Sequence, residues 1–71
     1  MMHIGRRIKE VVKEREMAVV DFSRAIPCSR VHVYKIFQKA TIDTGLLQRI
    51  SIVLRYDFFK DYSECIQNDD M

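Results

Sequence analysis

Residues 19–37, which read VVDFSRAIPCSRVHVYKIF, decide how this chain folds. Their apolar side chains recur at the spacing of three and four positions that places them on one face of a helix. Pro27 interrupts that spacing, because proline lacks an amide proton and clashes with the preceding helical turn. Ser29 then offers an N-cap, since its hydroxyl can accept a free backbone amide. The stretch predicts a helix that ends by Ile26, a tight turn, and a second helix over residues 29–37.

A helix, a tight turn and a second helix in succession form the helix-turn-helix arrangement. The residues that we expect to be buried between the two helices are Phe22, Ile26, Val33 and Ile36. Ser23 is a small residue at the point where the helices must approach closely. The outward face of the second helix then consists of Ser29, Arg30, Val31, Tyr34 and Lys35, with His32 at its flank.

Helical spacing of apolar residues predicts three further helices around this pair. The first spans about residues 3–15, and its narrow apolar face consists of Ile4, Ile8, Val11 and Val12. Asp43 can cap another helix, whose core stripe consists of Leu46, Leu47, Ile50, Val53 and Leu54. Asp57 can cap a short last helix, in which the aromatic rings that close the core are Phe58, Phe59 and Tyr62.

These helices make up the whole predicted domain. The apolar pattern fades after Ser63, and the β-branched residues fall at helical and not at alternating spacing. We therefore expect an all-α domain of five short helices over residues 1–62. Residues 63–71, which include Asp69 and Asp70, are expected to form an acidic, frayed tail. At 71 residues, 48% apolar and 31% charged, the chain has the size and composition of one globular domain.

The sequence shows no sign of a membrane or secreted protein. No apolar run approaches the roughly 20 residues needed to cross a bilayer, and no signal-type segment follows the first residues. Cys28 and Cys65 are too few to cross-link a small secreted domain, and neither belongs to a CxxC pair. We therefore expect a cytoplasmic protein with free thiols and no membrane partner.

Charge is distributed unevenly along the chain. Residues 1–56 contain eleven Lys and Arg against five Asp and Glu, a net charge of +6. Residues 57–71 contain one against five, a net charge of −4. A basic body with an acidic end favours a polyanionic partner, although a mildly basic surface is also common in proteins without one.

Over about residues 4–62 the chain resembles the lambda Cro and phage-repressor family of helix-turn-helix domains, often called XRE-like. Phe22-Ser23 stands where that family usually has Leu-Ala. The other matching residues are Ile4-Gly5, Cys28-Ser29-Arg30, Val33, Ile36, Leu47, Ile50, Leu54 and Asp57-Phe58-Phe59. The resemblance implies a compact five-helix domain of the lambda-repressor-like type.

Three positions depart from the family pattern. Pro27 replaces a Gly or Asn with positive φ, a conformation that proline cannot adopt, so the turn must have another geometry. Val12 and Phe37 replace a frequent buried Arg–Glu ion pair, and we expect these two apolar side chains to touch. Ala18 replaces the usual Ser or Thr cap of the second helix, which should leave that helix more prone to fray.

The resemblance implies sequence-specific binding of double-stranded DNA by a homodimeric transcriptional regulator, of the phage-repressor or antitoxin kind, and not an enzyme. Because the start of the second helix of the motif enters the major groove, the residues expected to contact bases are Ser29, Arg30, Val31 and Lys35. The residues expected to contact the DNA backbone are Tyr34, Gln38, Lys39 and Thr41. Tyr34 could equally be partly buried against a neighbouring helix or a dimer partner.

Two other classes of function remain open to the sequence. A module of the same fold could bind another protein, such as a toxin or a regulatory domain, without specific DNA binding. A metal enzyme would need a cluster of ligands or of acids and bases. Cys28 and His32 are four positions apart, but a metal site needs about four ligands, and His3 and Cys65 are distant in the sequence. We therefore predict no catalytic residue, no cofactor and no metal site.

Overall fold

Five α-helices and their connecting loops make up residues 2–68, the part of the chain that the computed structural model describes. Their bounds are α1 Ile4–Glu14, α2 Val19–Ala25, α3 Arg30–Phe37, α4 Thr44–Leu54 and α5 Phe58–Asn68. No strand occurs within that range. The predicted all-helical class, with five helices, is confirmed. None of these helices is both long enough and apolar enough to span a membrane.

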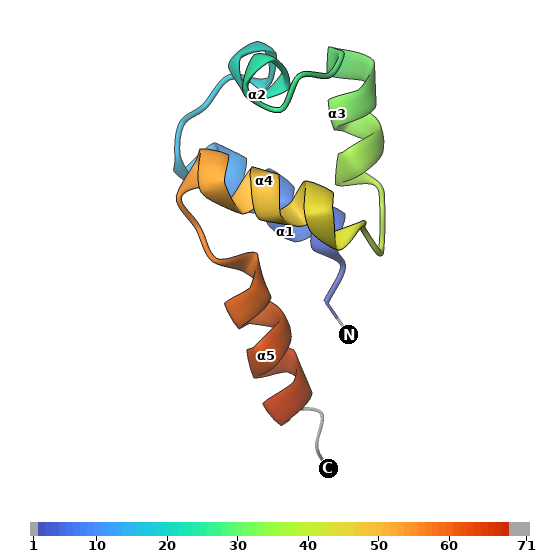
Figure 1. Ribbon diagram of the computed structural model, residues 1–71, viewed down its shortest axis with the longest axis vertical. Helices are drawn as coiled ribbons and strands as arrows, with labels where there is room; N and C mark the ends of the chain where they lie inside the picture. The colour runs from blue at the N-terminus through green and yellow to red at the C-terminus, as the bar shows by residue number, and fades with distance from the viewer. Residues whose placement is uncertain (1, 69–71) are drawn as a thin grey trace.

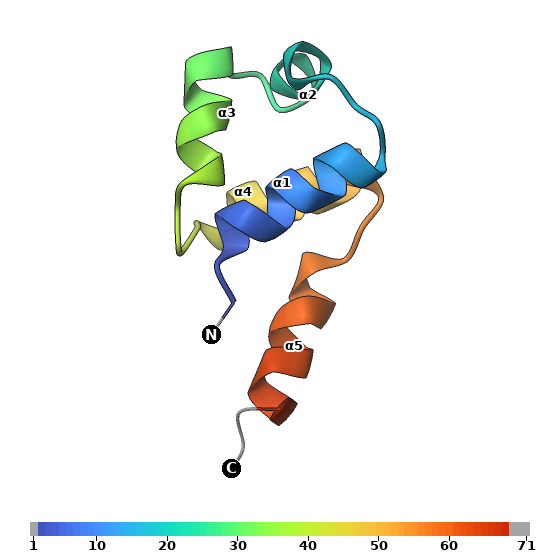
Figure 2. The same cartoon turned by 180° about the vertical axis from the view of Figure 1, so that it is seen from behind.

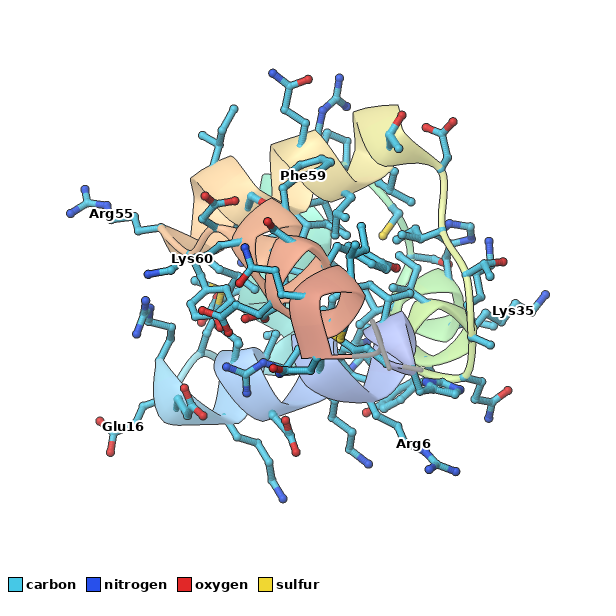
Figure 3. All side chains as sticks on the ribbon, turned by 90° about the horizontal axis from the view of Figure 1, so that it is seen from below. Arg6, Glu16, Lys35, Arg55, Phe59 and Lys60 are labelled. Carbon is cyan, nitrogen blue, oxygen red and sulfur yellow. The ribbon has the colours of Figure 1, made fainter. Side chains whose placement is uncertain are left out.

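The helices are arranged around one core (Figure 1). α2 and α3 lie together at one end, and α5 extends from the other end (Figures 1 and 2). α1 and α4 run along opposite sides, with α5 seen end-on between them in Figure 3. The buried apolar side chains, which all five helices and the turn after α2 supply, are Ile4, Ile8, Val11, Val12, Phe22, Ile26, Val33, Ile36, Phe37, Leu47, Ile50, Leu54 and Phe58.

The three predicted N-caps are confirmed. Ser29 Oγ accepts a hydrogen bond from the His32 amide at 3.1 Å, and Asp43 Oδ2 accepts one from Leu46 at 3.0 Å. Asp57 Oδ1 accepts amide bonds from both Phe59 and Lys60, at 3.0 and 3.2 Å. Each cap satisfies amides that have no partner inside the helix. Ala18 gives α2 no side-chain cap, as expected.

Two predictions about the end of the chain are wrong. Phe59 was expected in the core, but its side chain is 41% exposed. Successive residues of a helix point about 100° apart, and in α5 the Phe58 ring faces the core while the Phe59 ring is turned toward solvent. α5 also continues to Asn68, beyond the predicted fading of the helix after Ser63. Of the predicted frayed tail, Asp69 and Asp70 lie outside the described residues.

The start of α1 packs directly on the end of α3. The Gly5 amide donates to the Lys39 carbonyl at 2.9 Å, immediately after α3. A Cβ atom on Gly5 would lie 2.5 Å from the carbonyl oxygens of Ile36 and Phe37. Glycine is therefore required at this position for the two backbones to approach so closely. The contact fixes where α3 lies relative to the first turns of α1.

Candidate nucleic-acid interface

One face of α3 is turned to solvent along its whole length. Ser29, Arg30, Val31, His32, Tyr34 and Lys35 are exposed, whereas Val33, Ile36 and Phe37 are buried. The predicted division of this helix into an inner and an outer face is confirmed. Val31 is 66% exposed although it is apolar, and Tyr34 is 54% exposed. The outer face thus presents one methyl-bearing side chain among hydrogen-bond donors.

The outer face of α3 consists of two parallel rows, because side chains four positions apart lie above one another on a helix. Val31 and Lys35 form the first row, which points most directly away from the core. Arg30, Tyr34 and Gln38 form the second row, with Gln38 still in helical conformation at the C-cap. The second row lies on the flank next to Phe37, the buried residue of α3 that faces the start of α1.

The turn between α2 and α3 is held by hydrogen bonds and contains no residue with positive φ. The Cys28 amide donates to the Ser23 carbonyl at 2.9 Å, and Ser23 Oγ donates to the Val20 carbonyl at 2.8 Å. Positive φ occurs among the described residues only at Glu16 and Arg55. The turn around Pro27 therefore avoids the left-handed conformation, as the proline ring requires.

Cys28, within this turn, is partly buried, and burial raises the pKa of its thiol. The thiol is therefore protonated at neutral pH and is a poor nucleophile or metal ligand. Within residues 2–68, no three His, Cys, Asp or Glu side chains are grouped so that they could hold a metal ion.

The loop after α3 exposes the other residues predicted to contact the DNA backbone. Gln38, Lys39 and Thr41 are all exposed. The backbone of Lys39 is fixed from both sides, because its amide donates to Ile36 at 3.1 Å and its carbonyl accepts from Gly5 at 2.9 Å. The Lys39 ammonium group therefore extends from a well-defined anchor beside the end of α3.

A groove between α1 and α3 was not predicted from the sequence. It measures about 360 Å³, and its lining residues are His3, Arg6, Lys9, Tyr34, Phe37 and Gln38. Arg6 and Lys9 lie on the polar face of α1, and nothing in the sequence tells which side of that face adjoins α3. The one available signal was Gly5, the small residue at which α1 and α3 meet. The groove enlarges the candidate interface by two cations.

None of the cations beside α3 forms a salt bridge with another described residue. All salt bridges within residues 2–68 involve Arg7, which pairs with Glu10 at 3.0 Å, Asp61 at 3.1 Å and Glu14 at 3.8 Å. Hydrogen bonds to Tyr56 and Asp61 raise the pKa of Arg7 above its ordinary value. In Figure 3, Arg6 and Lys35 project outward on one side of the molecule, opposite Glu16 and Arg55.

Comparison with known proteins found no matching family model, no matching curated protein and no matching solved structure. The function must therefore be inferred from the geometry and chemistry of the outer face of α3 and the groove beside it.

Hydrogen-bond donors dominate this surface. Residues 29–39 contain no Asp or Glu. Their exposed guanidinium, ammonium, amide and hydroxyl groups can all donate to phosphate oxygens or to base edges. Ser29 Oγ accepts the capping amide of His32, which leaves its hydroxyl proton free to donate outward. A rigid helix with such a face is suited to a polyanion that has acceptors at regular spacing.

Proposed function

We propose that the chain binds double-stranded DNA in a sequence-specific manner, with α2 and α3 acting as a helix-turn-helix and α3 lying in the major groove. The outer face of α3 supports this proposal most, because it exposes cations and an apolar side chain on a capped helix, and residues 29–39 contain no carboxylate. Such a protein would regulate transcription without catalysing a reaction, in the way of a phage repressor or an antitoxin.

In this proposal the exposed residues of α3 and of the loop after it contact either bases or the DNA backbone. The Arg30 guanidinium reaches the O6 and N7 atoms of a guanine through two parallel bonds. Val31 contacts a thymine methyl group, which gives a use to an apolar side chain that is 66% exposed. Ser29 and Lys35 complete the base contacts, and the residues that contact the backbone are Tyr34, Gln38, Lys39 and Thr41.

We also propose that two copies pair through the surface between α4 and α5. The exposed apolar residues Ile52 and Phe59 lie on that surface, around a groove of about 410 Å³. Arg55 and Asp57 line the same groove. A two-fold pairing can therefore set the cation of one copy against the carboxylate of the other. The dimer would present two α3 helices to half-sites about one helical turn apart.

The deciding experiment is selection of bound sequences from a pool of random DNA duplexes, followed by salt titration of the enriched duplex. We expect a conserved motif to be enriched, and the logarithm of the binding constant to fall linearly with the logarithm of salt concentration. Absence of enrichment together with binding that is insensitive to salt would contradict the proposal. In that case a protein-binding module of the same fold would be the better interpretation.

A further inference from the structure

The groove between α1 and α3 differs in charge from the neighbouring grooves. Its lining supplies cations and neutral donors, with no carboxylate among the six described residues. By contrast, the groove of about 430 Å³ between the start of α1 and α5 includes three carboxylates, which belong to Asp57, Asp61 and Glu64, beside the cations of Arg7, Arg55 and Lys60. Of these two grooves, only the first offers cations that have no carboxylate beside them in the lining.

Three nitrogen donors of the α1–α3 groove come from successive turns at the start of α1. His3, Arg6 and Lys9 are three positions apart, so they lie along one flank of the helix. His3 Nδ1 accepts the Arg6 amide at 3.1 Å. In the neutral ring the proton is then on Nε2, which can donate outward. The hydrogen bond that caps α1 thus also orients a donor beside Arg6.

The opposite wall of the groove is rigid and comes from α3. Tyr34 packs edge-on against Phe37, with ring centres 6.1 Å apart, and Phe37 stacks on the buried Phe22. Gln38 follows Tyr34 by one helical turn and adds an exposed amide. The backbone contact at Gly5 holds the two walls together. The donors therefore surround a preformed site, and binding needs little rearrangement.

We propose that this groove binds a backbone phosphate of a nucleic acid, held by Arg6 and Lys9 with Tyr34 and Gln38 donating from α3. The inference rests on the proposed function. If Arg30, Val31 and Lys35 face the bases, Tyr34 and Gln38, which follow Arg30 along the second row, lie toward one edge of the major groove. That edge is formed by phosphates, and Tyr34 and Gln38 line the α1–α3 groove.

The test compares two double variants that lose the same net charge. Arg6→Gln with Lys9→Gln removes the cations of the groove. Lys13→Gln with Lys60→Gln removes two exposed cations that do not line it. We expect the groove variant to bind a duplex about tenfold more weakly at moderate salt, with a salt slope about one unit shallower, because one phosphate contact is lost. The control variant should keep the slope of the wild type.

The outcomes separate this inference from the proposed function. If the wild type binds the duplex and both double variants keep its salt slope, or lose slope equally, the groove is not a phosphate site and DNA binding by α3 still stands. If the wild type shows no salt-dependent binding to any duplex, both proposals are wrong. Thermal melting of each variant serves as a control for folding. Both double variants should melt close to the wild type, because all four substituted side chains are exposed.

A second measurement uses the wild-type chain alone. Backbone amide signals of residues 3–9 and of Gln38 are followed by NMR during titration with a short duplex, and separately with inorganic phosphate at the same phosphate concentration. We expect the duplex to shift these signals and inorganic phosphate to shift them far less. Shifts caused by inorganic phosphate alone would indicate a site for free phosphate and would overturn the inference.

Discussion

At the scale of single residues, Gly5 and Gly45 are both helical glycines, but only Gly5 has neighbours that exclude a side chain. A Cβ on Gly5 would lie 2.5 Å from two backbone carbonyl oxygens of α3. A Cβ on Gly45 would come close only to Asp43 Oδ2, at 3.1 Å, the oxygen that caps α4, and a shift of this side chain by a few tenths of an ångström would relieve the contact. The same substitution therefore meets two backbone carbonyls at one site and a side chain at the other.

We expect Gly5→Ala to lower the free energy of unfolding by at least about 2 kcal/mol, because α1 and α3 must separate to admit the methyl group. Gly45→Ala should stay within about 1 kcal/mol of the wild type, since alanine favours the helix by a similar amount. Urea titration of both variants measures the difference. Equal stabilities would mean that α1 and α3 do not approach each other as closely as the structure shows.

Substitution of Arg30 and of Lys39 should change DNA binding in different ways if one residue contacts a base and the other a phosphate. Arg30→Ala should cost about 1 to 3 kcal/mol on the selected site and relax the preference at one base pair, because a base edge loses its partner. Lys39→Ala should weaken specific and non-specific duplexes nearly alike and flatten the salt slope by about one unit. Binding titrations on a set of single-base variants decide between the two patterns. An unchanged ranking of those variants with Arg30→Ala would remove Arg30 from base recognition.

At the scale of the helices, α5 is attached through a small polar network as well as through Phe58. The Tyr56 hydroxyl donates to Asp61 at 2.8 Å and accepts from Arg7 at 2.6 Å, and Arg7 also pairs with Asp61. The bond from Arg7 lowers the pKa of Tyr56, but burial and the Asp61 carboxylate outweigh it, so this pKa lies above its ordinary value. The folded state therefore favours the protonated hydroxyl.

This shift predicts a loss of stability at alkaline pH. The contribution of Tyr56 is complete below its unfolded pKa of about 10 and is lost as the pH rises through the higher folded value. We expect the melting temperature to fall above about pH 10, and to fall less steeply in Tyr56→Phe. Tyr34→Phe is the matched control, because that hydroxyl is exposed and outside the network. If Tyr56→Phe and Tyr34→Phe follow the same profile, Tyr56 is not responsible for the loss.

The helices themselves were largely predictable, because their signals are local. Ser29, Asp43 and Asp57 cap helices within three residues of themselves, and Pro27 marks the turn without any tertiary information. The exposure of Phe59 was not predictable from composition, since either of two adjacent rings could have faced the core.

The missed part of the candidate site depends on how distant segments pack. The groove at Arg6 and Lys9 exists because Gly5 brings α1 against Lys39, which is 34 positions away. Similarly, Arg7 is one of several similar cations in the sequence, and only its distance to Asp61 shows that it is a structural ion pair. Periodicity assigns residues to a face but does not tell which helix lies against that face.

At the scale of the whole molecule, the two ends of the domain differ in charge. α2 and α3 lie at one end, and α5 projects from the other (Figure 1). α5 belongs to the segment from residue 57 onward, whose net charge is −4, whereas residues 1–56 have a net charge of +6. In the proposed complex, this distribution of charge would attract a duplex to the α3 end and repel it from the α5 end. If two copies bind one site, they must pair through a surface that leaves both α3 helices free, and the α4–α5 surface satisfies this condition.

The proposed dimer predicts a difference between two isoleucines of similar exposure. Ile52 is 70% exposed and lines the α4–α5 groove, whereas Ile66 is 73% exposed on α5 and does not line it. We expect Ile52→Lys to weaken self-association about thirtyfold, because it sets a charge into the apolar centre of the interface, and Ile66→Lys to leave association unchanged. Sedimentation equilibrium over a range of protein concentrations measures both constants, and melting curves show that each variant is folded. A wild type that stays monomeric at every concentration, or equal losses in the two variants, would exclude this surface.

Since Ile52 lies away from the outer face of α3, a monomeric Ile52→Lys variant should still bind a single half-site, with only the cooperativity on the paired site lost.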